Sequence, residues 1–255
     1  MLSDLYAADP GDKETSAGFL TRDVIRFFAV DIMLILLLRL LFWWGVFPNP
    51  DAYVAGQLLS KLVLLVYLVW LIRDRREAWP ETGVTSAGRW WAWLLALALY
   101  AGYYQIIPVL GRFNHLLMVR LHQWAGLAYV PEPQDIMLYI FSDILNSPTR
   151  VILVFFTVIA GPIMEELAFR GMGYDAYRRA IGVAGSLAWT SLLFGLYHFK
   201  LDLVLPLGAL GLLFGVVRVF SRTLWCAIFL HCLHNAVALW VMARELGLLK
   251  TWNLG

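Results

Sequence analysis

Two adjacent carboxylates, Glu165 and Glu166, stand inside an apolar part of the sequence. No charged residue occurs in 151–164 before them, and Arg170 follows four residues after Glu166. A charge near the centre of a bilayer costs about 2.5 kcal/mol or more, so such residues usually face a wet cavity or a partner. The pair either ends a helix at the headgroups, with Arg170 as the i,i+4 partner of Glu166, or belongs to a functional site.

Two later apolar runs also offer polar side chains at helical spacing. Phe194 and His198 are four residues apart, and so are His231 and Asn235. Each couple would therefore share one face of a helix. A lone histidine in an apolar helix more often packs against a neighbouring helix than binds a ligand. Polar residues on three separate segments favour a common site instead.

These residue types are the ones that hydrolysis of an amide bond by water requires. A buried carboxylate can act as the general base, and an imidazole can share or relay the proton. Histidine and asparagine side chains on another helix could donate hydrogen bonds to the tetrahedral oxyanion. Arg170 could hold one glutamate ionised and oriented while the other one reacts.

Other hydrolytic chemistries have less support. The sequence contains no His-Glu-x-x-His, Gly-x-Ser-x-Gly or Gly-x-Gly-Asp motif, which are the signatures of zinc, serine and aspartyl enzymes. Because imidazole and carboxylate suit zinc, a metal site built from Glu165, His198, His231 and His234 stays an open alternative. We expect neither a metal nor any other cofactor.

The elements that must position these residues are membrane helices. Hydrophobic residues make up 61% of the 255 and charged residues only 15%, which is typical of membrane proteins. Runs long enough to cross the hydrocarbon layer lie at about 24–47, 53–72, 90–110, 149–172, 182–200, 203–220 and 223–243. We therefore predict an all-α polytopic membrane bundle of about seven to eight transmembrane helices.

Residues 111–148 are harder to assign, because charged residues and histidines stand among leucines there. We interpret them as an interfacial amphipathic helix from Phe113 to Val130, a turn at Pro131–Pro133 and a short helix from Ile136 to Leu145. An eighth, imperfect crossing is the alternative.

Net charge and sorting signals indicate which partners to expect and how the chain is oriented in the membrane. A formal net charge of +2 and the lack of a phosphate-binding loop argue against nucleic acid as a partner. No signal peptide is expected in the polar first residues, and the excess of Lys and Arg in alternate short loops predicts a cytoplasmic N-terminus.

Asp31 and Arg39 of the first run and Lys61 of the second could pair across helices. Cys226 and Cys232 fall in one apolar run, so no disulfide is predicted. No oligomeric state is predicted.

The order of the three motifs resembles that of a known family. Glu165-Glu166-x-x-x-Arg170, Phe194-x-x-x-His198 and His231-x-x-x-Asn235 are similar to the three motifs of the CAAX protease and bacteriocin-processing (Abi) family. That family includes the Ras-converting CAAX endopeptidases. The motifs cover about residues 150–243, whereas the N-terminal half carries no such resemblance.

The resemblance implies a glutamate-dependent intramembrane endopeptidase of a bacterial inner membrane. Its substrate would be a membrane protein or lipid-anchored peptide, cut near a terminus. Carried over by position, the family's roles make Glu165 and His198 the residues that activate water, His231 and Asn235 the oxyanion hole, and Glu166, Arg170 and Phe194 supporting residues. The chain would then comprise a polar segment (1–23), N-terminal membrane helices (24–148), a catalytic core of the same membrane domain (149–243) and a tail (244–255).

Three other functions stay open from the sequence. The first is a zinc-dependent intramembrane metalloprotease that uses the same residues, with Glu165, His198 and His231 as ligands. The second is a membrane immunity or scaffold protein that keeps the fold but acts by binding. A transporter with a proton relay is the third, although no inverted repeat is visible.

Overall fold

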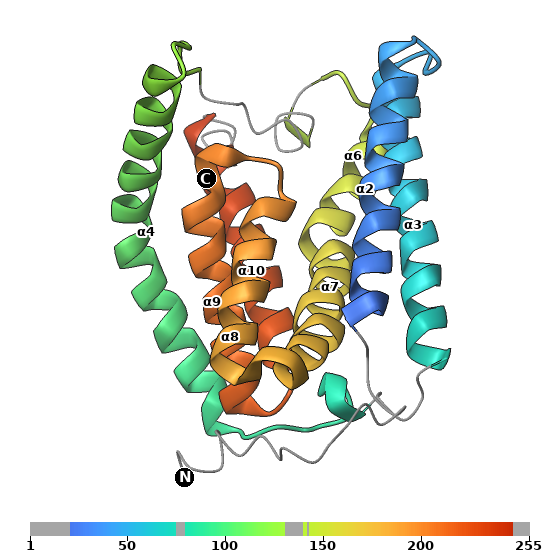
Figure 1. The fold of residues 1–255 in the computed structure, drawn as a ribbon. Coiled ribbons are helices and arrows are strands. Elements are labelled where there is room, and N and C mark those ends of the chain that lie inside the picture. The colour runs from blue at the N-terminus through green and yellow to red at the C-terminus, as the bar shows by residue number, and fades with distance from the viewer. Residues whose placement is uncertain (1–20, 75–79, 131–139, 142, 247–255) are drawn as a thin grey trace, which may run out of the picture. The chain divides into compact units, whose positions relative to one another are not determined.

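The chain is helical throughout its regular elements. A computed structural model describes residues 21–74, 80–130, 140–141 and 143–246 (Figure 1). Its elements are the α-helices α2 (Thr21–Trp43), α3 (Pro50–Asp74), α4 (Trp91–Trp124), α6 (Ser147–Phe155), α7 (Gly161–Glu166), α8 (Tyr174–Tyr197), α9 (Val204–Ser221) and α10 (Trp225–Glu245), the π-helices η3 (Phe156–Ala160) and η4 (Leu167–Gly173), and the 3₁₀ turns η2 (Pro80–Thr82) and η5 (Leu201–Leu203).

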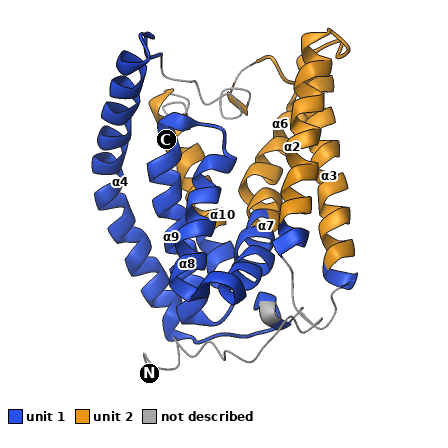
Figure 2. Ribbon diagram, in the orientation of Figure 1, with its two compact units in different colours: residues 1–24, 72–133, 165–230 blue, residues 25–71, 134–164, 231–255 orange. Residues whose placement is uncertain are grey.

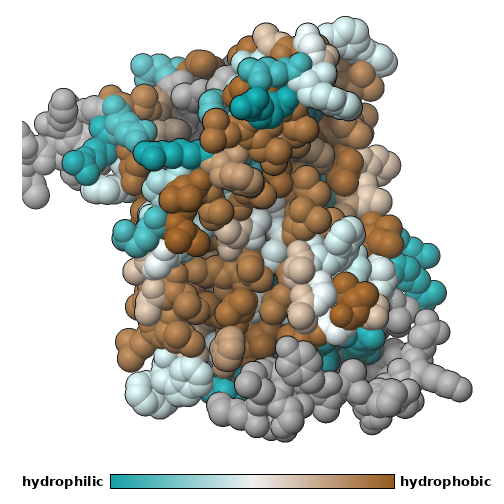
Figure 3. All heavy atoms as spheres, turned by 60° about the vertical axis from the view of Figure 1, so that its left-hand side comes forward, coloured by the Kyte–Doolittle hydropathy of each residue, from teal (hydrophilic) through white to brown (hydrophobic). Residues whose placement is uncertain are grey.

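Several helical stretches have the length and surface of membrane spans. Among the described residues, five stretches are long and apolar enough to cross a bilayer: Pro50–Asp74, Trp91–Trp124, Ser147–Tyr197, Leu201–Ser221 and Trp225–Glu245. Large apolar side chains such as Val66, Leu94 and Val109 are more than 60% exposed, and Figure 3 shows hydrophobic residues over most of one face. Such a surface suits acyl chains rather than water. The prediction of an all-α polytopic membrane protein is confirmed, whereas the number of crossings stays a prediction.

The longest stretch contains a turn. Ser147–Tyr197 has 51 residues and would measure about 77 Å as a straight helix, far more than a hydrocarbon layer of about 30 Å. Gly182 interrupts it with φ 72° and ψ 178°, a conformation that glycine adopts without a steric penalty. The turn coincides with the predicted start of a new segment at residue 182.

The prediction for residues 111–124 is wrong. These residues continue α4, which runs unbroken from Trp91 to Trp124, instead of forming a separate interfacial helix or an eighth crossing. Its end is capped at Gly126, whose φ is 71°, with Leu127 N–H donating to the carbonyl of His122 at 2.8 Å. In the predicted helix at 136–145, residues 140 and 141 are helical, and 136–139 lie outside the described residues.

The chain divides into two compact units (Figure 2). Unit 1 comprises residues 1–24, 72–133 and 165–230, and unit 2 comprises 25–71, 134–164 and 231–255. Helices α7 and α10 run from one unit into the other, since the boundaries fall after Met164 and after Leu230.

In unit 1, α9 packs against both α8 and α4. The contact with α8 is close because a Cβ at Gly195 would lie 2.5 Å from the carbonyl oxygen of Val204. The 3₁₀ turn η2 is tied to the end of α9, where the Nε of Arg218 donates to the carbonyl of Thr82 at 3.2 Å. Thr223, at the α9–α10 turn, donates to the carbonyl of Ser86 at 2.7 Å.

Unit 2 joins α2 and α3 through a buried ion pair. The Nζ of Lys61 lies 2.7 Å from Oδ1 of Asp31, whose side chain is fully buried. This pair confirms the expectation that intramembrane charges of the first two segments meet across helices. An apolar cluster of the same unit is formed by Val54, Ile140, Leu145, Leu153 and Leu239.

Candidate active site

The second glutamate of the first motif forms a buried ion pair through one of its carboxylate oxygens. Glu166 and Arg170 are both 0% exposed, and Nη1 of Arg170 donates to Oε1 of Glu166 at 2.9 Å. The predicted i,i+4 partnership is therefore confirmed. The alternative that the carboxylates end a helix is wrong, because helical structure continues from Glu166 through η4 into α8.

The guanidinium of Arg170 is held by two further elements of unit 1. Its Nη2 donates to the carbonyl of Gly211 in α9 at 2.8 Å. Its Cζ lies 4.4 Å from the ring centre of Phe194, 5.4 Å from that of Phe214 and 5.5 Å from that of Phe169. Ring faces attract a cation, and more strongly where water is absent. Two hydrogen bonds and three rings thus replace part of the water that this cation lost, while its buried Nε makes no hydrogen bond within the described residues.

Glu165 has a different environment from its neighbour. Successive residues of a helix point about 100° apart, since one turn takes 3.6 residues. Glu165 accordingly leaves the face on which Glu166 meets Arg170, and it is half-buried rather than fully buried. Of the two residues, Glu165 is the one that is partly exposed, although its Oε2 is buried.

The second motif fixes the tautomer of its histidine. Nδ1 of His198 lies 2.8 Å from the carbonyl oxygen of Phe194, and because a carbonyl only accepts, Nδ1 carries the hydrogen. In neutral His198, Nε2 is then the nitrogen with a lone pair. The ring of Phe194 lies 4.9 Å from that of His198 and also contacts Arg170. Phe194 therefore bridges the first and second motifs physically.

Two π-helices flank the glutamates, η3 before α7 and η4 after it. The N–H of Gly161 donates to the carbonyl of Phe156, five residues back. This wide turn immediately precedes Pro162, which has no N–H and cannot continue an α-helical ladder. Inserted π turns of this kind occur often at functional sites. Pro162 is visible in the sequence, but the π geometry of the turn before it is not.

The third motif lies in unit 2, on α10. His231 is buried, and Asn235 and His234 are half-buried. Nδ2 of Asn235 donates to the carbonyl of Thr157 in η3 at 2.8 Å, so Asn235 satisfies a carbonyl of the π-helix. A carboxamide has two N–H groups, which leaves a second donor for another acceptor. The first two motifs lie in unit 1, and the third lies in unit 2.

Sequence reasoning missed two residues of this arrangement, Gly211 and Phe214 of α9. A Cβ at Gly211 would lie 3.0 Å from Nη2 of Arg170, so the absence of a side chain lets the guanidinium reach the backbone carbonyl. Phe214 is fully buried against Phe194 and Arg170. No motif covers either residue, because their contacts arise from the packing of α9.

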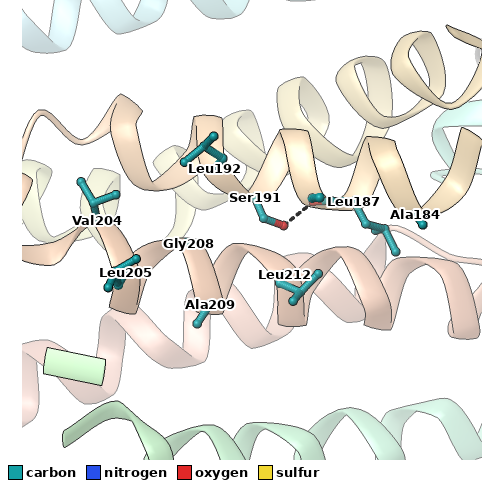
Figure 4. Close-up of a pocket in the computed structure, with 10 residues that line it drawn as sticks. Ala184, Leu187, Ser191, Leu192, Val204, Leu205, Gly208, Ala209 and Leu212 are labelled. Atoms are coloured by element: carbon teal, nitrogen blue, oxygen red, sulfur yellow. Dashed lines mark hydrogen bonds between the residues drawn. The ribbon is translucent and has the colours of Figure 1, made fainter. Parts of the chain in front are cut away.

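A pocket elsewhere in unit 1 contains none of the predicted site residues. It has a volume of about 430 Å³ and lies between α8 and α9, lined mainly by Ala and Leu side chains. The hydroxyl of its lining residue Ser191 turns back to the carbonyl of Leu187, 2.5 Å away (Figure 4). The pocket therefore offers no reactive group.

The metal alternative gains no support from ligand grouping. Within the part of the chain that the structure describes, no three His, Cys, Asp or Glu side chains are grouped as metal ligands. The expectation of a reaction without metal stays a prediction.

Substituting Gly211 tests the guanidinium's surroundings. Gly211→Ala should lower the free energy of unfolding by about 1–3 kcal/mol, the usual cost of overpacking a filled core. Gly208→Ala is the matched control one turn earlier in α9, because a Cβ there meets only a carbonyl oxygen at 3.6 Å. That variant should be neutral or up to about 1 kcal/mol more stable. Equal thermal unfolding midpoints for both variants in lipid nanodiscs would contradict the packing described.

Part of the chain is similar in sequence to known proteins. Residues 147–237 match the family described as Type II CAAX prenyl endopeptidase Rce1-like. A protein of Bacillus subtilis (strain 168), provisionally named as the membrane peptidase YdiL, is 28% identical over 93 residues, which are 36% of this chain and 37% of that protein. No solved structure matches. The matched segment contains all three motifs, and over this part of the chain the sequence is similar to the CAAX prenyl endopeptidase family.

Proposed function

We propose that the chain is a glutamate-dependent intramembrane endopeptidase that cuts a membrane protein or lipid-anchored peptide near a terminus. The observation that carries this proposal is the unequal state of the two glutamates. Arg170 holds Glu166 in a fully buried pair, while Glu165 beside it is half-buried. The names of the matched family and of the Bacillus relative, a prenyl endopeptidase and a membrane peptidase, support a peptide substrate.

In the proposed reaction, water is the nucleophile. Glu165 accepts a proton from the water molecule, and the oxygen forms a bond to the carbonyl carbon of the scissile peptide. Nε2 of His198 shares that proton, because Nδ1 is engaged by the carbonyl of Phe194. When the C–N bond breaks, the proton passes to the departing amine. The products are a carboxylic acid and an amine, which ionise to a carboxylate and an ammonium group by passing one proton from acid to amine, so atoms and charge balance.

His231 and Asn235 would stabilise the oxyanion that forms between these steps. Donors aimed at a developing negative charge contribute most where water is excluded. One N–H of Asn235 is engaged by Thr157, which fixes the orientation of the carboxamide and directs its second N–H. We place this reaction in a bacterial inner membrane with the N-terminus in the cytoplasm, as the distribution of Lys and Arg favours.

The role of Glu165 can be tested on all the membrane proteins of a cell at once. Glu165→Gln should abolish cleavage, because an amide of the same size cannot accept the proton of water. The readout is a mass-spectrometric comparison of the terminal peptides of membrane proteins in cells that express the wild-type chain, the variant or neither. New termini should appear with the wild type alone.

Glu245→Gln provides the matched control, since Glu245 is exposed at the end of α10 and the chemical change is identical. Chelation of the purified wild-type chain should leave its activity intact, whereas one bound zinc lost together with activity would indicate a metalloprotease. Identical termini with the wild type and with Glu165→Gln would rule out the proposed base. A binding role as an immunity or scaffold protein would then fit better.

The oxyanion role predicts a selective loss of turnover. Asn235→Ala should reduce kcat by roughly 10²-fold or more with little change in substrate binding, as when a single oxyanion donor is removed. His231→Ala should behave similarly, and the double variant should lose less than the product of the two effects, since both donors serve one charge. His234→Ala is the control on the same helix, with a milder loss expected. Equal damage at His234 would mean that α10 binds substrate or metal instead.

A further inference from the structure

The segment that follows His198 has a backbone that must be held in place from outside. His198 directly follows α8 as its C-cap, and Phe199 after it has φ 53°. A positive φ is unusual for a residue with a bulky side chain and persists only where surrounding contacts fix it. Lys200 is extended, and η5 then leads into α9 at Val204.

Asn114 of α4 binds both sides of this connection. Its Nδ2 donates to the carbonyl of Leu201 at 2.9 Å, and its Oδ1 accepts from the N–H of Leu205 at 3.0 Å. Leu205 is in the first turn of α9, where backbone N–H groups lack partners inside the helix. Asn114 is 1% exposed, so the two bonds form away from water. It caps α9 from a different helix.

Tyr129, just beyond the end of α4, holds the middle of the connection. Its hydroxyl donates to Oδ1 of Asp202 at 2.5 Å. Its ring lies 5.2 Å from the rings of both His115 and His122, which are two turns apart on α4. Desolvation first, and then the hydrogen bond and charge of Asp202, raise the pKa of Tyr129 to about 12. The phenol therefore stays protonated at any physiological pH, and its hydroxyl can donate the hydrogen bond to Asp202.

A third contact supports the same region. The hydroxyl of Tyr103 in α4 donates to the carbonyl of Pro206 in α9 at 3.2 Å. Helix α4 and the residues after it thus contact the chain at Leu201, Asp202, Leu205 and Pro206. All of these residues belong to unit 1, and none of the α4 residues lies in the segment that matches the family.

We propose that Asn114 and Tyr129 are positioning residues that fix His198 by holding the connection from Phe199 to Leu205. The inference rests on the proposed function, in which His198 handles the proton. The bond from Nδ1 to Phe194 orients the ring from the helix side, but His198 stands where a helix normally frays. The anchored connection prevents that fraying and keeps Nε2 at one place.

Hydrogen exchange tests the physical part without any substrate. In Asn114→Leu and Tyr129→Phe, amides of residues 199–205 should exchange about tenfold faster, the effect of losing one or two net hydrogen bonds. Exchange within 225–245 should not change. Tyr104→Phe is the matched control on α4, because the Tyr104 hydroxyl hydrogen-bonds with that of Tyr100 on the same helix. Unchanged exchange at 199–205 in both variants would overturn the proposal.

Kinetics then test the consequence for His198. The probe is a peptide whose cleavage depends on Glu165, obtained from the comparison of membrane-protein termini described above. Asn114→Leu should lower kcat about tenfold or more with KM within about twofold of wild type, as expected for a displaced proton-transfer group. Asn114→Asp keeps the acceptor for Leu205, and Asp202→Asn keeps an acceptor for Tyr129, so both should retain more activity than the apolar variants.

Failure of the proposed function and failure of the positioning role of Asn114 and Tyr129 give different results. If the wild-type chain yields no cleavage that depends on Glu165, the proposed function fails while the hydrogen-exchange result still stands. If the wild type cleaves the peptide and Asn114→Leu cleaves it equally fast despite faster exchange at 199–205, the connection does not position His198 and the inference is wrong. A loss of kcat without rescue by Asn114→Asp or Asp202→Asn would also contradict it, because a general loss of folding explains that pattern.

Discussion

The buried pair of Glu166 and Arg170 is the interaction on which the organisation of unit 1 depends. Both side chains are fully buried, and the three residues between them are apolar. An ion pair removed from water is stable only when its geometry is good and its charges make further hydrogen bonds. Here the end of α7 and η4 supply the two charges, α9 supplies a carbonyl, and three phenylalanines surround the cation. The buried guanidinium of Arg170 thereby constrains how η4, α8 and α9 pack.

The same pair explains how two adjacent glutamates can differ in chemistry. Glu166 is neutralised by Arg170 and has little freedom to react, whereas Glu165 is directed to another face of the helix. Phe194 then connects the pair to His198, since its ring touches the guanidinium and the imidazole while its carbonyl accepts from Nδ1. A single aromatic residue thus links charge neutralisation in the first motif to the tautomer of the histidine in the second.

How far the sequence predicts this arrangement depends on how local each contact is. The Glu166–Arg170 pair and the Phe194–His198 contact were predictable because i,i+4 spacing on a helix sets them. Gly211, 41 residues from Arg170, was not, because its role comes from the close packing of α9. The continuous α4 was also missed: its polar residues suggested an interface, but the structure uses Asn114 and His122 to hold other segments. Pro162 cannot continue an α-helical ladder, yet only the hydrogen-bond pattern shows that η3 is a π-helix.

The central claim is that Glu166 and Arg170 act as one buried unit. A double-mutant cycle with Glu166→Gln, Arg170→Met and the combined variant, measured as free energies of unfolding in lipid bilayers, tests it most directly. Each single variant leaves a buried charge without its partner and should cost about 3–5 kcal/mol. The double variant should cost clearly less than the sum, by about 2 kcal/mol or more. Losses that add to within about 0.5 kcal/mol would contradict the account, because independent residues behave in that way.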